Sequence, residues 1–224
     1  MTCGLILAAG ESRRMGSPKP LLQFQGETFL DRLIGLFSRR CSPVIVVLGA
    51  HRETVRAGLR RAGEAVIVEN PDFARGQLSS MQCGLRVVPA EAESVLFTLV
   101  DHPAITPATI DALLDAPGAP LAIARFSPRT AQDGRPAPPE FSEVPPFSAA
   151  REARPLRSGR RGHPILIAQS LLPEFLALPH ESSAREVIAR YESRIAYLDV
   201  DDPGVLADVD DPAAYAQLIQ ESAA

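Results

Sequence analysis

The sequence predicts an α/β protein, a single three-layer α/β/α domain built around a mostly parallel, Rossmann-like sheet. Short apolar runs recur along the 224 residues, and they are continuous rather than alternating, as in strands covered on both faces. Amphipathic stretches of helical period separate these runs, and strand–helix alternation of this kind produces parallel sheets with helices on both sides. A chain of this length can bury a substantial core, so we expect one domain over residues 1–224.

Local sequence patterns predict the individual strands and helices. The expected strands span residues 2–7, 44–48, 65–68, 94–100, 121–126, 164–167 and 195–198. Helical faces are formed by two sets of apolar residues: Phe29, Leu30, Leu33, Ile34 and Phe37, and then Met81, Leu85 and Val88. Thr106 and Asp211, each followed by proline, are expected N-caps, and Ser183 with Glu186 fits a capping box.

One stretch breaks the alternation. Residues 127–158 contain seven of the 21 prolines and show no apolar periodicity, which predicts a long Pro/Arg-rich loop insertion rather than a domain. The arginines of this stretch are expected to solvate it, although they could also face an anionic ligand or a partner protein; they are Arg129, Arg135, Arg151, Arg154 and Arg157.

Composition excludes several classes of function. The formal net charge is −4, whereas proteins that bind nucleic acid usually carry a basic excess, so we expect no nucleic-acid partner. No apolar run approaches the ~20 residues of a membrane helix, and the N-terminus does not have the form of a secretory signal. Three widely spaced cysteines, Cys3, Cys41 and Cys83, form no disulfide framework. We therefore expect a cytoplasmic protein without a membrane segment.

The loop after the first strand carries the most informative residues. It runs Leu-Ala-Ala-Gly-Glu-Ser-Arg-Arg-Met-Gly-Ser-Pro-Lys-Pro over residues 7–20. Small residues let the backbone approach a ligand, and free N–H groups can form an anion-binding nest. Arg14 can grip phosphate oxygens with two parallel hydrogen bonds, and Lys19 adds a compact charge. Neither a P-loop nor a GxGxxG fingerprint is present. The alternative is a flexible basic surface loop.

This run resembles the LxxGxSxRMGxxK signature of the MobA-like NTP transferases, in particular the molybdenum cofactor cytidylyltransferases. The resemblance implies a fold of the nucleotide-diphospho-sugar transferase type. It also implies that Leu7, Ala8, Ala9 and Gly10 wrap a nucleotide, while Arg14 and Lys19 hold its triphosphate and serve catalysis. Family members with alanine at the position of Ala9 tend to use CTP, and those with glycine there tend to use GTP.

A second segment follows the third expected strand. Gly76 permits a turn, and Ser79 or Ser80 could cap the helix that begins there. The run also resembles the family segment G-x-x-x-S-x-x-x-G, whose serine lies at the nucleobase. The resemblance therefore assigns Gly76 and Ser80 to nucleotide binding, and the capping role remains open for both serines.

Acidic residues occur at two further positions. Asp101 follows the expected strand 94–100, at the edge of the sheet where a hard cation could bind together with phosphate oxygens. Asp208 and Asp210 share one face if their segment is extended. These segments resemble the family motifs Asp-x-Pro and Asp-x-Asp-Thr-Pro, which implies that Asp101 and Asp210 bind Mg²⁺, with Asp208 a weaker candidate. The acidic residues at 199, 201 and 202 are expected to form a solvated turn.

Gly162 and His163 precede Pro164 and resemble the family's Gly-His-Pro segment beside the acceptor, although a structural role for the histidine remains open. Together these motifs imply a Mg²⁺-dependent transfer of a nucleoside monophosphate, CMP from CTP, to a phosphorylated acceptor such as molybdopterin. One alternative is transfer to a different phosphorylated acceptor. A second alternative is a non-catalytic module that binds nucleotide and delivers molybdenum cofactor to an apo-molybdoenzyme. The missing glycine fingerprint disfavours a redox Rossmann protein.

Overall fold

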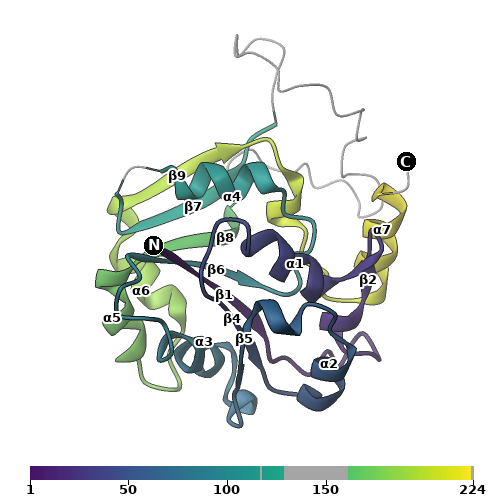
Figure 1. Ribbon diagram of the computed structural model, residues 1–224. Helices are drawn as coiled ribbons and strands as arrows, with labels where there is room; N and C mark the ends of the chain where they lie inside the picture. Colours follow the sequence, from purple (N-terminus) through teal and green to yellow (C-terminus); the bar gives the residue numbers. More distant parts are fainter. Residues whose placement is uncertain (117, 129–160, 223–224) are drawn as a thin grey trace.

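The computed structural model describes residues 1–116, 118–128 and 161–222. The described residues form a central sheet covered by helices on both faces, as the sequence predicts (Figure 1). Of the expected Pro/Arg-rich insertion at 127–158, residues 129–158 lie outside the described part of the chain, and so do its five arginines. The prediction for that insertion therefore stays a prediction.

The main sheet has seven strands within the described residues, in the order β5-β4-β1-β6-β8-β7-β9. Their bounds are β1 (Thr2–Ala8), β4 (Val44–Leu48), β5 (Val66–Glu69), β6 (Ser94–Leu99), β7 (Leu121–Phe126), β8 (Arg161–Ala168) and β9 (Ile195–Val200). All neighbouring pairs are parallel except those of β8, which runs antiparallel to both β6 and β7. A small antiparallel hairpin, β2 (Gln23–Phe24) and β3 (Glu27–Thr28), stands apart from this sheet.

Helices cover the two faces of the sheet in two groups. One apolar core lies under α1 (Phe29–Phe37), α2 (Arg52–Gly58), α4 (Pro107–Leu114) and α7 (Pro212–Ser222), and the other lies under α3 (Gln77–Leu85), α5 (Leu172–Leu176) and α6 (Ala184–Arg190). Alternate residues of β1 divide between these cores: Ile6 belongs to the first, and Leu5 and Leu7 belong to the second. The continuous apolar run of this strand follows because both its faces are buried.

The outermost strands depart from this expectation. β5 and β9 form the two edges of the sheet, and their residues are only partly buried, with Val66 48% exposed. A continuous apolar run therefore identified these strands correctly but overstated how well they are covered. The β2–β3 hairpin and α2 are further elements that the apolar pattern did not predict.

Helix caps follow the local sequence in two cases. The Ser183–Glu186 capping box opens α6, and the Asp211 carboxylate accepts a hydrogen bond from the Ala214 N–H at the start of α7. Thr106 is the N-cap residue of α4 as expected, but its side chain makes no capping hydrogen bond to that helix. Its hydroxyl donates instead to the Asp202 carboxylate.

Asp202 corrects a second expectation. The residue is 4% exposed, and its carboxylate accepts hydrogen bonds from Thr106, Thr109 and the Gly204 N–H, so it is no part of a solvated turn. This buried carboxylate joins the start of α4 to the 3₁₀ helix η6 (Pro203–Leu206).

The strand order determines where a ligand can bind. The chain passes from β1 to β4 and β5 on one side, and then returns to place β6 on the other side of β1. In open α/β sheets, ligands bind beyond the carboxyl ends of the strands at such a reversal. The carboxyl ends of β1 and β6 therefore mark the expected site.

Candidate active site

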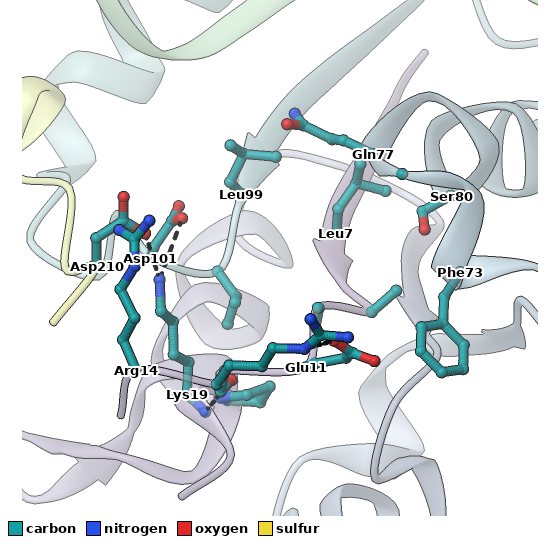
Figure 2. A pocket seen from close by; sticks show the side chains of 18 of the residues that line it. Leu7, Glu11, Arg14, Lys19, Phe73, Gln77, Ser80, Leu99, Asp101 and Asp210 are labelled. Carbon is teal, nitrogen blue, oxygen red and sulfur yellow. Dashed lines mark hydrogen bonds and ion pairs between the residues drawn. The ribbon is translucent and has the colours of Figure 1, made fainter. Parts of the chain in front are cut away.

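A cleft of about 550 Å³ opens at this point. Four segments line it: the loop after β1, the turn before α3, the end of β6 and the segment before α7. Figure 2 labels ten of the lining residues: Leu7, Glu11, Arg14, Lys19, Phe73, Gln77, Ser80, Leu99, Asp101 and Asp210. Lys19, Asp101 and Asp210 gather at one end of the cleft, and Phe73 and Ser80 lie at the other. The cleft thus has a charged end and a less polar end.

The loop after β1 is shaped by its own hydrogen bonds. Ser12 has a positive φ of 53°, and its hydroxyl oxygen accepts a hydrogen bond from the Lys19 N–H at 2.9 Å. This contact closes the loop onto the 3₁₀ helix η1 (Lys19–Leu21) and so fixes the base of the Lys19 side chain. A Cβ added at Gly10 would meet no atom of the described residues within 4 Å, so space beside this glycine is open. Leu7, Ala8, Ala9 and Gly10 all line the cleft.

Lys19 is the centre of the charged end. Its Nζ donates to Asp210 Oδ1 at 2.7 Å and lies 3.8 Å from Asp101 Oδ2, although Lys19 and Asp210 are 191 positions apart in the chain. The Lys19 side chain is 13% exposed, so these interactions are partly shielded from water. A backbone hydrogen bond of 3.0 Å from the Val209 N–H to the Asp101 carbonyl holds the C-terminal segment against the end of β6.

The three carboxylates at this end have different pKa values. Burial raises the pKa of Asp101, and the charge of Lys19 opposes that effect. Burial and the charge of Asp101 raise the pKa of Asp208 to about 6. The hydrogen bond from Lys19 lowers the pKa of Asp210, which is also near Arg14. Negative charge is therefore concentrated where one lysine only partly balances it, which is an environment that attracts a cation.

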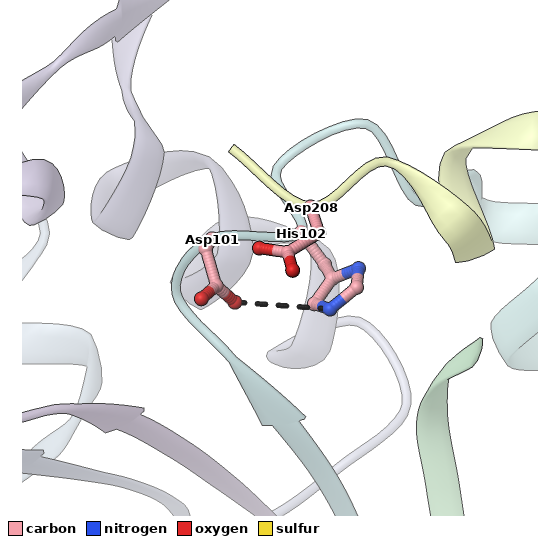
Figure 3. A group of neighbouring side chains, drawn as sticks. All are labelled: Asp101, His102 and Asp208. Atoms are coloured by element: carbon pink, nitrogen blue, oxygen red, sulfur yellow. Dashed lines mark ion pairs between the residues drawn. The ribbon is translucent and has the colours of Figure 1, made fainter. Parts of the chain in front are cut away.

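The residues here fit a divalent cation. Asp101, His102 and Asp208 each offer a ligand atom, and these atoms lie within 4.8 Å of one another (Figure 3). Asp101 Oδ1 is buried and has no hydrogen-bond partner among the described residues, so an oxygen is available for a ligand. Carboxylate oxygens are the ligands that Mg²⁺ prefers, and an imidazole nitrogen suits a transition metal. Asp208, which the sequence ranked below Asp210, is thus the carboxylate grouped with Asp101.

His163 packs against His102. Its ring packs 4.8 Å from the ring of His102 and 5.4 Å from that of Phe97, measured between centroids. Burial lowers the pKa of His163 to about 3 and that of His102 to about 4, so both rings are neutral at physiological pH. A Cβ on Gly162 would lie 1.9 Å from the Val205 carbonyl oxygen, which is a packing reason for glycine. Neither Gly162 nor His163 is among the residues that line the cleft.

The less polar end is formed by the turn before α3. Gly76 has a φ of 103° and is the N-cap residue of α3, so the alternative in which Ser79 or Ser80 caps this helix is wrong. The Ser79 hydroxyl donates within the turn to the carbonyls of Gly76 and Asp72. Ser80 lines the cleft together with Gly76.

The structure therefore brings most of the predicted residues to one cleft. Arg14, Lys19, Asp101 and Asp210 join the small residues of the first loop, and Gly76 and Ser80 lie opposite. Phe73 and Gln77 also line the cleft, although no motif in the sequence pointed to them. Phe73 is an aromatic residue between a strand end and a helix start, which is a signal that could have found it.

The sequence model of the MobA-like NTP transferase domain matches residues 4–195. The chain belongs to this family. The MobA-like chain is 24% identical to the molybdenum cofactor cytidylyltransferase of Escherichia coli (strain K12), over 93% of its own length and 90% of that protein. It is 34% identical to the molybdenum cofactor guanylyltransferase of Sinorhizobium fredii, over 49% of its own length and 50% of that protein.

A solved structure has the same fold. The crystal structure of Rv0371c from Mycobacterium tuberculosis H37Rv superposes with a TM-score of 0.72 at 25% identity, covering 98% of the MobA-like chain and 97% of that protein. The fold is that of the nucleotide-diphospho-sugar transferases. The family assignment makes the MobA-like chain a nucleotidyltransferase. Among the described residues, no helix has the length and apolar character needed to cross a membrane.

Proposed function

We propose that this nucleotidyltransferase transfers CMP from CTP to the phosphate of a molybdopterin-like acceptor, with Mg²⁺ and release of pyrophosphate. The observation that carries the proposal is the polarity of the cleft. Lys19, Asp101 and Asp210 occupy one end, where a triphosphate and its cation would lie, and Phe73 and Ser80 occupy the other, where a base would lie (Figure 2).

The reaction needs positioning more than covalent catalysis. A phosphate oxygen of the acceptor attacks the α-phosphorus of CTP, the bond from that phosphorus to the bridging oxygen breaks, and pyrophosphate leaves. Lys19 and Arg14 neutralise charge on the phosphate oxygens and orient the leaving group. Asp101 with Asp210 and Asp208 would hold Mg²⁺, which when bound polarises phosphate oxygens.

Ala9 supports CTP over GTP as the nucleotide. It is 5% exposed, and its carbonyl accepts the Ala50 N–H at 3.0 Å, which fixes its backbone at the end of β1. Gly49 packs against the Ala9 backbone, and a Cβ at Gly49 would lie 2.7 Å from the Ala9 carbonyl oxygen. The Ala9 backbone therefore has little space in which to shift away from a ligand. We expect the Ala9 methyl group to reduce the space beside the base and so to favour the smaller pyrimidine.

The acceptor is inferred from the relative that covers nearly the whole chain, whose name specifies molybdenum cofactor cytidylylation. His163, whose ring packs against that of His102, and the preceding Gly162 remain our candidates for the acceptor side.

The test is pyrophosphate release from CTP, GTP, ATP and UTP with Mg²⁺, with and without molybdopterin. Release from CTP that depends on the pterin supports the proposal. Release that requires a different phosphorylated acceptor would retain the transfer chemistry and refute molybdopterin. Tight CTP binding without release under any condition would instead favour a non-catalytic delivery role toward a molybdoenzyme.

A further inference from the structure

A buried hydrogen-bond network behind the less polar end of the cleft has one donor left over. Its centre is Asn70, which is 4% exposed and follows β5. The Asn70 Oδ1 accepts the Asp72 N–H at 3.0 Å. Because a backbone N–H can only donate, this contact fixes the orientation of the Asn70 side-chain amide, and its NH₂ group must point the other way.

That NH₂ group faces two neighbouring serines. Asn70 Nδ2 donates to Ser79 Oγ and to Ser80 Oγ, each at 3.0 Å. Both hydroxyl oxygens therefore accept a hydrogen bond from Asn70, and each serine keeps its own proton for a further partner.

The two serines use that proton differently. Ser79 donates to the Gly76 carbonyl at 2.8 Å and lies 3.0 Å from the Asp72 carbonyl, so its proton is committed to the turn. Ser80 donates to no acceptor in the described part of the chain, is 4% exposed and lines the cleft. Figure 2 shows its hydroxyl on the cleft side of α3, near Phe73 and Leu7. A buried hydroxyl proton without an acceptor is costly, so this proton is available to a ligand in the cleft.

We propose that Asn70 is a positioning residue that fixes Ser80 as a hydrogen-bond donor to the nucleobase, so that this end of the cleft selects a base with an acceptor facing Ser80. The inference rests on the proposed function for the presence of a nucleotide, and it adds the direction of the hydrogen bond and the residue that sets it. In cytosine the acceptors are the O2 and N3 atoms of the pyrimidine edge. The exocyclic amine is a donor and cannot satisfy Ser80.

The experiment measures dissociation constants by calorimetry with Mg²⁺ for CTP and for ribose 5′-triphosphate, which lacks a base. Ser80→Ala should weaken CTP binding about tenfold, the effect of one lost buried hydrogen bond, and leave ribose triphosphate binding unchanged. Asn70→Asp keeps the acceptor for the Asp72 N–H but replaces the NH₂ by a carboxylate oxygen. That oxygen takes the Ser80 proton, so CTP binding should fall by the same factor.

The double variant Asn70→Asp/Ser80→Ala should bind CTP no more weakly than either single variant, because both remove the same hydrogen bond. Ser79→Ala is the matched control. It removes the neighbouring hydroxyl, which serves the turn, and should lower the melting temperature while CTP affinity stays within about twofold of the unmodified protein.

Three results would overturn the inference. Ser80→Ala could bind CTP as tightly as the unmodified protein. Asn70→Asp could weaken ribose triphosphate as much as CTP, which would make Asn70 a purely structural residue. Ser79→Ala could match the loss in Ser80→Ala. If the unmodified protein binds CTP, each of these three results refutes the role of Asn70 and Ser80 and leaves the proposed function intact. Failure of the unmodified protein to bind any nucleotide would instead refute the proposed function itself.

Discussion

Lys19 offers a sharp test of the site, because one side chain balances carboxylates that come from distant parts of the chain. Its Nζ is 2.7 Å from Asp210 Oδ1 and 3.8 Å from Asp101 Oδ2, and the side chain is 13% exposed. Lys19→Met removes the charge and keeps most of the volume. We expect kcat/KM for CTP to fall by about 10²–10³, or about 3–4 kcal/mol, as when one positioned donor to a transition-state charge is lost.

Stability should change much less than activity. Without Lys19 the pKa of Asp101, already raised by burial, rises further, so the carboxyl group takes up a proton instead of remaining as an uncompensated buried charge. This response limits the loss in unfolding free energy to about 1 kcal/mol. Urea unfolding measures that quantity, and pyrophosphate release measures kcat/KM.

Arg56→Met is the control for Lys19→Met. Arg56 lies on α2, apart from the residues that line the cleft; its side chain is 64% exposed and Nη1 lies 3.8 Å from Glu69 Oε1, so its removal should change kcat/KM by less than about threefold. The reasoning about Lys19 would be refuted if Lys19→Met kept full activity. It would equally be refuted if the unfolding free energy fell as far as the activation free energy rose, because the variant would then be a folding defect.

Four further predictions follow from named contacts. Gly10→Ala should leave the melting temperature unchanged but weaken CTP binding, because its Cβ would enter open space in the cleft. Gly162→Ala should instead lower the unfolding free energy by about 2 kcal/mol or more, because its Cβ would meet the η6 backbone. Equal melting temperatures for the two variants would contradict this contrast. Asp101→Asn should weaken Mn²⁺ binding, measured by electron paramagnetic resonance, by about tenfold or more, and an unchanged affinity would remove Asp101 from the metal site. Burial lowers the pKa of His163 from 6.5 to about 3, so its contribution to stability is present above about pH 6.5 and is lost as the pH falls. Between about pH 7 and pH 5, His163→Phe should therefore lose about 2 kcal/mol less unfolding free energy than the unmodified protein loses. Parallel profiles of unfolding free energy against pH would rule this out. Ala9→Gly should raise GTP turnover relative to CTP turnover by about tenfold, and a ratio that stays constant would separate Ala9 from base selection.

The sequence by itself determined where the seven strands of the main sheet lie along the chain, several helix starts and the residues of the first loop. These features depend on residues close together in the chain: the apolar runs of β1 and β6, the capping box at Ser183, and the spacing of Arg14 and Lys19. Local periodicity and hydrogen bonding within a turn or two decide such features, so a reader of the sequence can find them.

Only the tertiary structure decided which distant groups meet. The antiparallel insertion of β8 between β6 and β7 places His163 against His102, and a backbone hydrogen bond to Asp101 brings Asp208 and Asp210 beside Lys19. The burial of Asp202 and the commitment of the Ser79 proton likewise depend on partners that no local pattern specifies. The order of the elements along the chain does not determine which side chains will be partners. Hydrogen bonds and ion pairs between distant residues form only after the sheet has fixed the position of each strand end.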